Sequence, residues 1–280
     1  MSTTYQFKLA LQSNQEIQVE LHQGERPLLI AASRTPSGNR DYTAGTGTAM
    51  EIPTPESPLD QVASLPGGSL LLGMAEDGLP LLLDLYDPTP GPLLVAGDGG
   101  SGKTAFLRSL ALASDLQNPG EIQFGVLTPF PEEWAALETL PNCLGIWPAY
   151  HLASRNFLSQ LVSWADVLTE SRQVVLILLD GLDLLAACGF PVQHDLRWLL
   201  MYGPERQVWP VVTVNPGRLT RLENWLDYFQ TRILGQVKRL QTARLLVSDP
   251  DIDLAALLPG RQFGLSRPEG WLKFCLPTAQ

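Results

Sequence analysis

The sequence predicts an α/β fold built on a largely parallel sheet. Several continuous apolar runs have the length of strands, and such runs are typical of strands buried on both faces of a parallel sheet. These runs alternate along the chain with segments whose apolar residues recur at helical spacing. One run leads directly into a glycine-rich turn and a helix at residues 93–110. With 280 residues and a 45% hydrophobic composition, the chain is long enough for one large domain, or for a large and a small one.

The first 65 residues differ from the rest. Residues 5–12 and 15–23 alternate apolar and polar side chains, which predicts short antiparallel strands and a small β-rich N-terminal region over residues 1–32. Residues 33–65 are rich in Ser, Thr, Gly and Pro and lack periodicity, which predicts a flexible linker or long loop. The α/β domain then occupies residues 66–280. The alternative is that residues 33–60 form a surface loop inside one domain.

The remaining elements follow from periodicity and turn signals. Residues 68–88 predict a hairpin around Glu76, Asp77 and Gly78, and residues 261–276 predict a second one with its turn near 268–270. Strands are predicted at 92–97, 122–128, 143–148, 173–180, 208–215 and 231–236. Helices are predicted at 103–113, 153–171, 194–203 and 236–248.

The glycine-rich turn carries the pattern Gly-x-x-x-x-Gly-Lys-[Ser/Thr] between a strand and a helix. Its glycines let the backbone wrap around an anion, so that several N–H groups and the positive end of the helix dipole face phosphate oxygens. Lys103 would reach the β- and γ-phosphates of ATP, and the Thr104 hydroxyl would bind Mg²⁺. The predicted nucleotide-binding residues are Gly97, Asp98, Gly99, Gly100, Ser101, Gly102, Lys103, Thr104 and Ala105.

Acidic and polar residues follow the next apolar strands. Asp180 ends a buried strand and is predicted to hold Mg²⁺, although it could also cap the next helix. Gly181 follows it, where many P-loop ATPases have a glutamate that activates water, and the next acid, Asp183, could activate water or cap a helix. At the tip of a later strand, "VVTVNP" offers Thr213 and Asn215, and Asn215 is either a γ-phosphate sensor or a turn residue.

Over residues 68–278 the order of these motifs resembles the FtsK/SpoIIIE branch of the HerA–FtsK P-loop ATPases. The similar segments are "LLLGMAEDGLPLLLDLYDPTPGPLLVAGDGGSGKTAFLRSLALAS", "ILLDGLDLL", "VVTVNP" and the closing "TRILGQVKRLQTARLLVSDPDIDLAALLPGRQFGL". The aspartate-rich "LLDGLDLL" and the ending "LPGRQFGLSRPEGWLKFCLP" are most similar to the degenerate ATPase modules of EccC-type proteins of type VII secretion.

The resemblance implies a RecA-like core that assembles as a homo-oligomeric ring, commonly hexameric, or within a hetero-assembly, and moves double-stranded DNA or protein. It also implies that a neighbouring subunit supplies an arginine to the nucleotide site, and Arg206 is the candidate. Arg244 lies at the family's helix arginine. The chain departs from the family at Gly181, at Val214-Asn215 in place of Gln-Arg, and in lacking a recognisable winged-helix domain.

Composition bounds the cellular setting. The net charge of −10 excludes a protein that coats nucleic acid non-specifically. A local basic stretch could still contact DNA, an acidic partner or a neighbouring subunit, or it could be a solvated helix face; it comprises Arg218, Arg221, Arg232, Lys238, Arg239 and Arg244. Three scattered cysteines, no signal-peptide core and no membrane segment favour a cytoplasmic protein.

Two functions follow from these observations. The first is an Mg²⁺-dependent ATPase acting as, or within, a translocase. The second is a nucleotide-binding subunit that does not hydrolyse ATP and whose ATP state controls assembly, because Gly181 lacks the side chain that would activate water. A small-molecule kinase is disfavoured, since residues 115–172 offer only Arg155 and Arg172 for a phosphate-binding lid.

Overall fold

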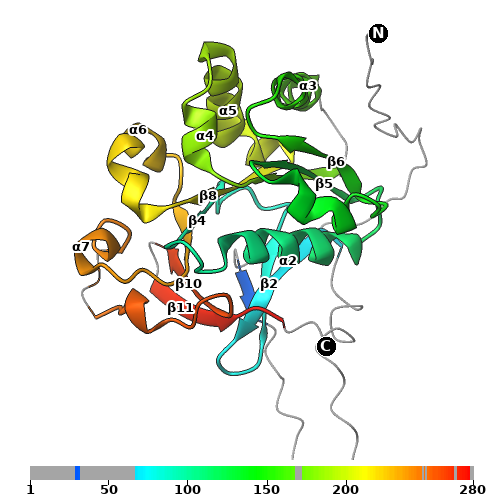
Figure 1. Cartoon of the computed structure of the whole chain (residues 1–280). Coiled ribbons are helices and arrows are strands. Elements are labelled where there is room, and N and C mark those ends of the chain that lie inside the picture. Colours follow the sequence, from blue (N-terminus) through cyan, green and yellow to red (C-terminus); the bar gives the residue numbers. More distant parts are fainter. Residues whose placement is uncertain are drawn as a thin grey trace, which may run out of the picture.

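The computed structural model describes residues 29–31, 67–167, 172–247, 249, 251–267 and 270–277 (Figure 1). The strands predicted at 5–23 and the linker predicted at 33–65 lie outside these residues. The predicted domain boundaries therefore stay predictions. None of the helices in the described part of the chain has the length and apolar character needed to cross a bilayer.

The described strands form one sheet in the order β1-β3-β2-β11-β10-β9-β4-β8-β7-β5-β6. One half, which we call the parallel block, pairs in parallel throughout. It consists of β9 (Thr231–Leu234), β4 (Leu93–Ala96), β8 (Val208–Val214), β7 (Val174–Leu179), β5 (Ile122–Thr128) and β6 (Cys143–Pro148). This arrangement confirms the predicted α/β fold class.

The other half of the sheet, the antiparallel wing, continues from the β9 edge of the parallel block. Both predicted hairpins lie in it and are confirmed as β2–β3 and β10–β11. The wing consists of β10 (Gln262–Arg267), β11 (Gly270–Cys275), β2 (Ser69–Ala75), β3 (Pro80–Asp84) and β1 (Leu29–Ala31).

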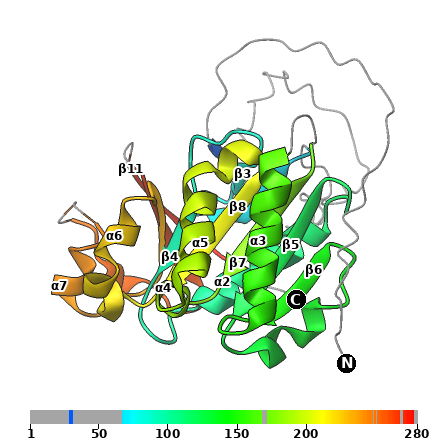
Figure 2. The same ribbon diagram turned by 90° about the horizontal axis from the view of Figure 1, so that it is seen from above.

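Helices cover both faces of the sheet (Figures 1 and 2). Helix α2 (Lys103–Asp115) lies on one face, while α3 (Leu152–Val167) and α5 (Phe190–Tyr202) pack together on the other. Alternate residues of β4 therefore enter two cores: Leu93 and Val95 join that of α2, and Leu94 and Ala96 join that of α3 and α5. Shorter elements complete the fold: η1 (Pro131–Leu137), α4 (Leu182–Ala186), η2 (Pro204–Arg206), η3 (Pro216–Arg221), α6 (Glu223–Leu226), α7 (Leu240–Ala243) and η4 (Leu254–Ala256).

Two predicted helices have different lengths in the structure. The helix predicted at 194–203 begins earlier, at Phe190, because Pro191 occupies the first turn, where its fixed φ favours a helix start. The helix predicted at 236–248 is wrong except for the four residues of α7. Residues 236–238 instead run in extended contact with the glycine-rich turn and with residue 254, so their backbone groups are used outside a helix.

Candidate functional site

The glycine-rich turn lies at the carboxyl edge of the parallel block, between β4 and α2. Strand β4 is paired with β8 on one side and β9 on the other, and the chain leaves it through α2 to reach β5 beyond β7. Ligands of doubly wound folds bind where the connections diverge in this way, because the two loops leave a crevice. The fold thus presents this turn at the position typical of a ligand site.

Glycine is required at several positions of the turn. Gly100 and Gly102 have φ values of 78° and 96°, a region that side chains disfavour. A Cβ on Gly102 would also collide with the backbone of Gly260, and one on Gly97 would collide with the Ser101 hydroxyl. The close approach of two backbone segments, as well as the turn itself, therefore depends on these glycines.

Lys103 begins α2 and folds back into the turn. Its Nζ donates hydrogen bonds to the carbonyl oxygens of Gly97 at 2.7 Å and Asp98 at 3.0 Å. Burial lowers the pKa of Lys103, and the nearby Asp180 and Asp98 carboxylates oppose that shift. The ammonium is thus held at the centre of the loop, within reach of any anion that the loop encloses.

Asp180 forms hydrogen bonds with residues of three elements, α2, β8 and β5. Its Oδ2 accepts a hydrogen bond from the Thr104 hydroxyl at 3.0 Å, and its Oδ1 accepts one from the Thr213 hydroxyl at 2.8 Å. Its own N–H donates to Leu127 O in β5 at 2.8 Å. Thr213 is 1% exposed and occupies the tip of β8, between the strands that carry the turn and Asp180. The carboxylate is therefore fixed beside the first turn of α2.

Gly181 and Asp183 lie immediately beyond Asp180. Gly181 has a φ of 113° and forms the N-cap of α4 without a side-chain hydrogen bond. The Asp183 carboxylate accepts a hydrogen bond from Nη1 of Arg218, which extends from η3 and is 59% exposed in its side chain. Asp183 is therefore the partner of an arginine at the rim of the site, and it makes no capping bond to α4.

Four further predicted residues lie outside this cluster. Asn215 caps η3, because its Oδ1 accepts a hydrogen bond from Gly217 N–H at 3.0 Å. Arg206 is exposed in η2 at the amino end of β8, so the length of that strand, roughly 20 Å, separates it from the turn of its own chain. Ala105 and Arg244 are exposed, the former in α2 and the latter at the end of α7.

The side chains beside the turn that could bind a metal ion offer only oxygen atoms. Among the described residues there is no cluster of three or more His, Cys, Asp or Glu side chains able to hold a metal ion. The Thr104 hydroxyl and the Asp180 carboxylate are hard oxygen ligands of the kind that Mg²⁺ accepts when water and phosphate oxygens complete its octahedron. The residues present therefore fit a magnesium ion delivered with a nucleotide.

Sequence reasoning missed the second layer that supports the turn. Asp98 N–H donates to Gln236 O at 2.9 Å, and Lys238 N–H donates to Asp98 Oδ2 at 2.8 Å. Gly260 N–H donates to Ser101 O at 2.9 Å. The only signals for these contacts were two isolated glycines. A Cβ on Gly235 would lie 3.2 Å from the Ser101 side chain, and the Cα of Gly260 lies only 2.4 Å from where a Cβ on Gly102 would be.

The basic residues between 218 and 244 do not form one helix face. Arg218 and Arg221 belong to η3 and Arg232 belongs to β9. Lys238 and Arg239 precede the short helix α7, and Arg244 follows it. All except Arg232 are exposed. The stretch is therefore divided among η3, β9 and the segments that flank α7.

Comparisons with solved structures agree with this architecture. EccC from Thermomonospora curvata (ATPases 2 and 3, with a signal sequence peptide) is 15% identical with a TM-score of 0.61, over 76% of this chain and 41% of that one. EssC from Geobacillus thermodenitrificans (ATPases 2 and 3) is 14% identical with a TM-score of 0.63, over 76% and 45%. This chain thus spans less than half of either protein.

A third solved structure is the pCW3 conjugation coupling protein TcpA, in a monomer form with ATPγS. It is 14% identical with a TM-score of 0.58, over 78% of this chain and 68% of that one. The resemblance to EccC-like and FtsK-like ATPases is thereby confirmed at the level of the fold. No curated protein matches the sequence.

The family model of the NACHT domain matches residues 91–247, which include the glycine-rich turn, Asp180 and Thr213. This match covers more than half of the 280 residues. Together with the P-loop geometry, it shows that the chain belongs to the NACHT domain family of P-loop NTPases.

Proposed function

We propose that this chain binds ATP with Mg²⁺ at the P-loop and hydrolyses it slowly as a subunit of a ring-shaped DNA or protein translocase. The observation that carries the proposal is the cluster at Asp180. Its carboxylate accepts hydrogen bonds from Thr104, in the first turn of α2, and from Thr213, at the tip of β8. A carboxylate held in this position beside a P-loop suits it to anchor a magnesium ion on the nucleotide.

The residues of the site divide the work of phosphate binding. The backbone N–H groups of the turn and the amino end of α2 bind the phosphate chain, because they are oriented donors with a favourable dipole. Lys103 exchanges the carbonyl oxygens of Gly97 and Asp98 for the β- and γ-phosphates. Thr104 and Asp180 would hold a magnesium ion, which would supply positive charge beside the phosphates.

Slow turnover follows from the surroundings of Gly181. No side chain at that position can take a proton from the attacking water, and the carboxylate of Asp183 is paired with Arg218. While this ion pair persists, the Asp183 carboxylate is engaged by the guanidinium of Arg218. Arg206, exposed at the opposite edge of the sheet, is available to a neighbouring subunit as an arginine finger.

The partner assignment rests on the similar structures. The EccC structure contains a signal sequence peptide, and TcpA is a conjugation coupling protein. We therefore propose a polymer substrate, either an extended polypeptide or double-stranded DNA. The exposed basic residues Arg221, Lys238, Arg239 and Arg244 supply charges for contact with a phosphate backbone or with a neighbouring subunit.

One observation favours a second function, a nucleotide-binding subunit that does not hydrolyse ATP. The φ of 113° at Gly181 is a conformation that a glutamate would adopt only with strain. The backbone there does not suit an activating glutamate. This favours a site that binds ATP without hydrolysing it. In this role ATP would set the assembly state of the protein.

ATP turnover and ATP binding together separate the two functions. The full chain, with Mg²⁺, is assayed with and without double-stranded DNA, beside Lys103→Ala, which removes the phosphate-binding ammonium. DNA-stimulated turnover that Lys103→Ala abolishes supports the motor. Equal background turnover in both proteins, with ATP bound only by the wild type, supports the non-hydrolysing subunit. Failure of the wild type to bind ATP contradicts both.

A further inference from the structure

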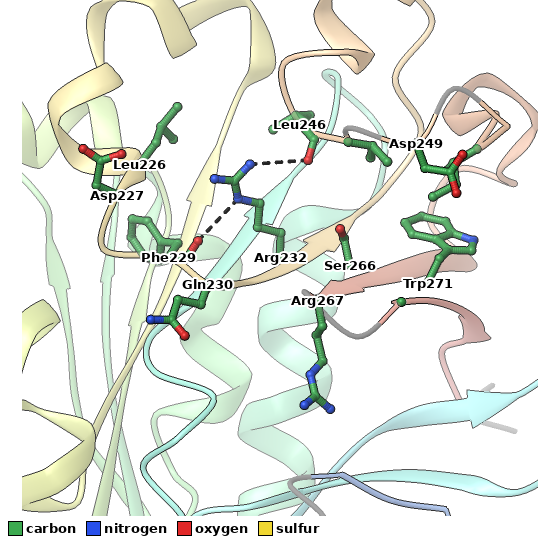
Figure 3. Close-up of a pocket in the computed structure, with 13 residues that line it drawn as sticks. Leu226, Asp227, Phe229, Gln230, Arg232, Leu246, Asp249, Ser266, Arg267 and Trp271 are labelled. Carbon is green, nitrogen blue, oxygen red and sulfur yellow. Dashed lines mark hydrogen bonds between the residues drawn. The ribbon is translucent and has the colours of Figure 1, made fainter.

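A second cavity lies on the antiparallel side of the P-loop strand, away from the nucleotide site (Figure 3). Its volume is about 650 Å³, within the range of small-molecule sites in proteins. Strand β9, the loops around α6 and α7, and the β10–β11 hairpin enclose it. The lining residues used below are Phe229, Arg232, Leu246, Val247, Ser266 and Trp271.

Arg232 is the charged group that β9 contributes to the cavity. It is half-buried in the middle of β9, with Ser266 of β10 and Leu94 of β4 as its cross-strand neighbours. Its Nε donates to Phe229 O and its Nη1 to Leu246 O, each at the long distance of 3.4 Å (Figure 3). No described carboxylate forms an ion pair with it. A partly buried cation without a counter-charge is costly, and an anion bound in the cavity would offset that cost.

Apolar and aromatic side chains form much of the remaining wall, which Gln230 and Arg267 also line. Phe229, Leu246 and Val247 are buried, and the Trp271 ring faces the same space from the β10–β11 hairpin (Figure 3). The two acidic residues, Asp227 and Asp249, are at the rim, and Asp249 Oδ1 already accepts a hydrogen bond from Asp251 N–H at 2.9 Å. The cavity thus combines one inner positive charge with a surface suited to a flat or branched hydrocarbon body.

We propose that this cavity is a binding site for an amphipathic small molecule with an oxyanion head, such as a carboxylate or sulfonate, on an aromatic or aliphatic body. The oxyanion pairs with the guanidinium of Arg232, and the body packs against Phe229 and Trp271. Ser266 lies directly opposite Arg232 and is placed to donate a hydrogen bond to the same head group. The site is separate from the P-loop, since neither Lys103 nor Asp180 lines it.

The probe for the test is 1-anilinonaphthalene-8-sulfonate, whose fluorescence rises in apolar surroundings. The full chain should bind it saturably, and Arg232→Gln should weaken that affinity at least tenfold, because one charge-assisted interaction is lost. Ser266→Trp should also weaken it, because the indole fills the cavity. Arg221→Gln removes an exposed arginine outside the cavity and should bind like the wild type, as should Lys103→Ala.

Thermal melting of each variant checks that it is folded. No saturable fluorescence change in the wild type would overturn the proposal. So would wild-type affinity in Arg232→Gln, or in a Ser266→Trp variant that melts as a folded protein. A loss of binding in Lys103→Ala equal to that in Arg232→Gln would place the dye at the nucleotide site and would equally count against the cavity.

Discussion

The ammonium of Lys103 is the buried cation of the P-loop, and its environment makes phosphate binding sensitive to pH. Burial lowers its pKa below the ordinary 10.5, so the folded chain loses this proton at a lower pH than the unfolded chain does. The ammonium charge is the one that attracts phosphate. It is lost as the pH rises through the lowered pKa.

We therefore expect ATP affinity to fall with rising pH before pH 10.5 is reached. Fluorescence titrations with a labelled ATP at successive pH values measure this fall. Lys103→Met, which lacks the titrating group, should bind at least tenfold more weakly and show a flat profile over the same range. An alkaline decrease of equal size in Lys103→Met would assign the titration to another group.

Thr213 acts through Asp180, because its hydroxyl donates to Oδ1 of that carboxylate. Thr213→Val removes the hydrogen bond and keeps the shape, so we expect an Mg²⁺ requirement for ATP binding raised about fivefold. The loss of stability should be about 1 kcal/mol. Thr231→Val is the matched control. Thr231 is also buried, but its hydroxyl donates to Pro90 O just before the start of β4, at the end of the sheet away from Asp180. Equal Mg²⁺ requirements in both variants would refute the role of Thr213.

At the scale of elements, the start of helix α4 decides which side chain can follow Asp180. Gly181 is the N-cap of that helix at a φ of 113°, and a Cβ there would lie 3.2 Å from Leu184 Cδ1. We predict that Gly181→Glu lowers stability by about 1–2 kcal/mol and does not raise ATP turnover, because the carboxylate is added on a strained backbone.

Gly189→Glu provides the comparison for Gly181→Glu. Gly189 is the N-cap of α5 and has a φ of −63°, and a Cβ added there would meet only Pro191 Cδ, at 3.9 Å. Its substitution should change the free energy of unfolding by less than about 0.5 kcal/mol, as surface changes usually do. Urea unfolding measures both variants, and a Gly181→Glu protein with raised turnover would show that the backbone adapts.

Helix α2 connects the P-loop to the antiparallel wing. Phe106 of α2 is fully buried, with its ring centroid 5.3 Å from that of Phe263 in β10 and 6.2 Å from that of Phe274 in β11. We expect Phe106→Ala to cost about 3–5 kcal/mol of stability in urea unfolding. Leu112→Ala, on the same helix but 49% exposed, should cost far less. Similar losses in the two variants would mean that the wing does not anchor α2.

How far the sequence predicts the fold and the site differs from one element to another. The P-loop and Asp180 were found from the sequence because their chemistry is written in short, local patterns at the ends of strands. The contacts of Gly260 and Lys238 with the turn were not, since they depend on which loops meet in space. The same contacts removed most of the helix predicted at 236–248, because tertiary hydrogen bonds overrode local propensity. The partner of Asp183, Arg218, likewise lies on an element 35 residues away.

At the scale of the whole molecule, substitution of Arg206 tests whether neighbouring copies complete the nucleotide site. It is too far from the P-loop of its own chain to act there, so any effect on hydrolysis requires a neighbouring copy. We expect Arg206→Ala to leave ATP affinity unchanged and to lower turnover at least tenfold at protein concentrations that support oligomers. Arg155→Ala, an exposed arginine on α3, is the control. Unchanged turnover in Arg206→Ala would exclude it as the finger.

Strand β9 borders both the P-loop and the second cavity. Arg232 faces the cavity, and Gly235, just beyond the end of the strand, lies so close to Ser101 that an added Cβ would be 3.2 Å from its side chain. Any coupling between occupants of the two sites would pass through this segment of four residues, and thermodynamic linkage would make it mutual. The factor by which ATP changes the affinity of a cavity ligand must equal the factor by which that ligand changes the affinity of ATP. Either titration alone therefore measures the coupling in both directions.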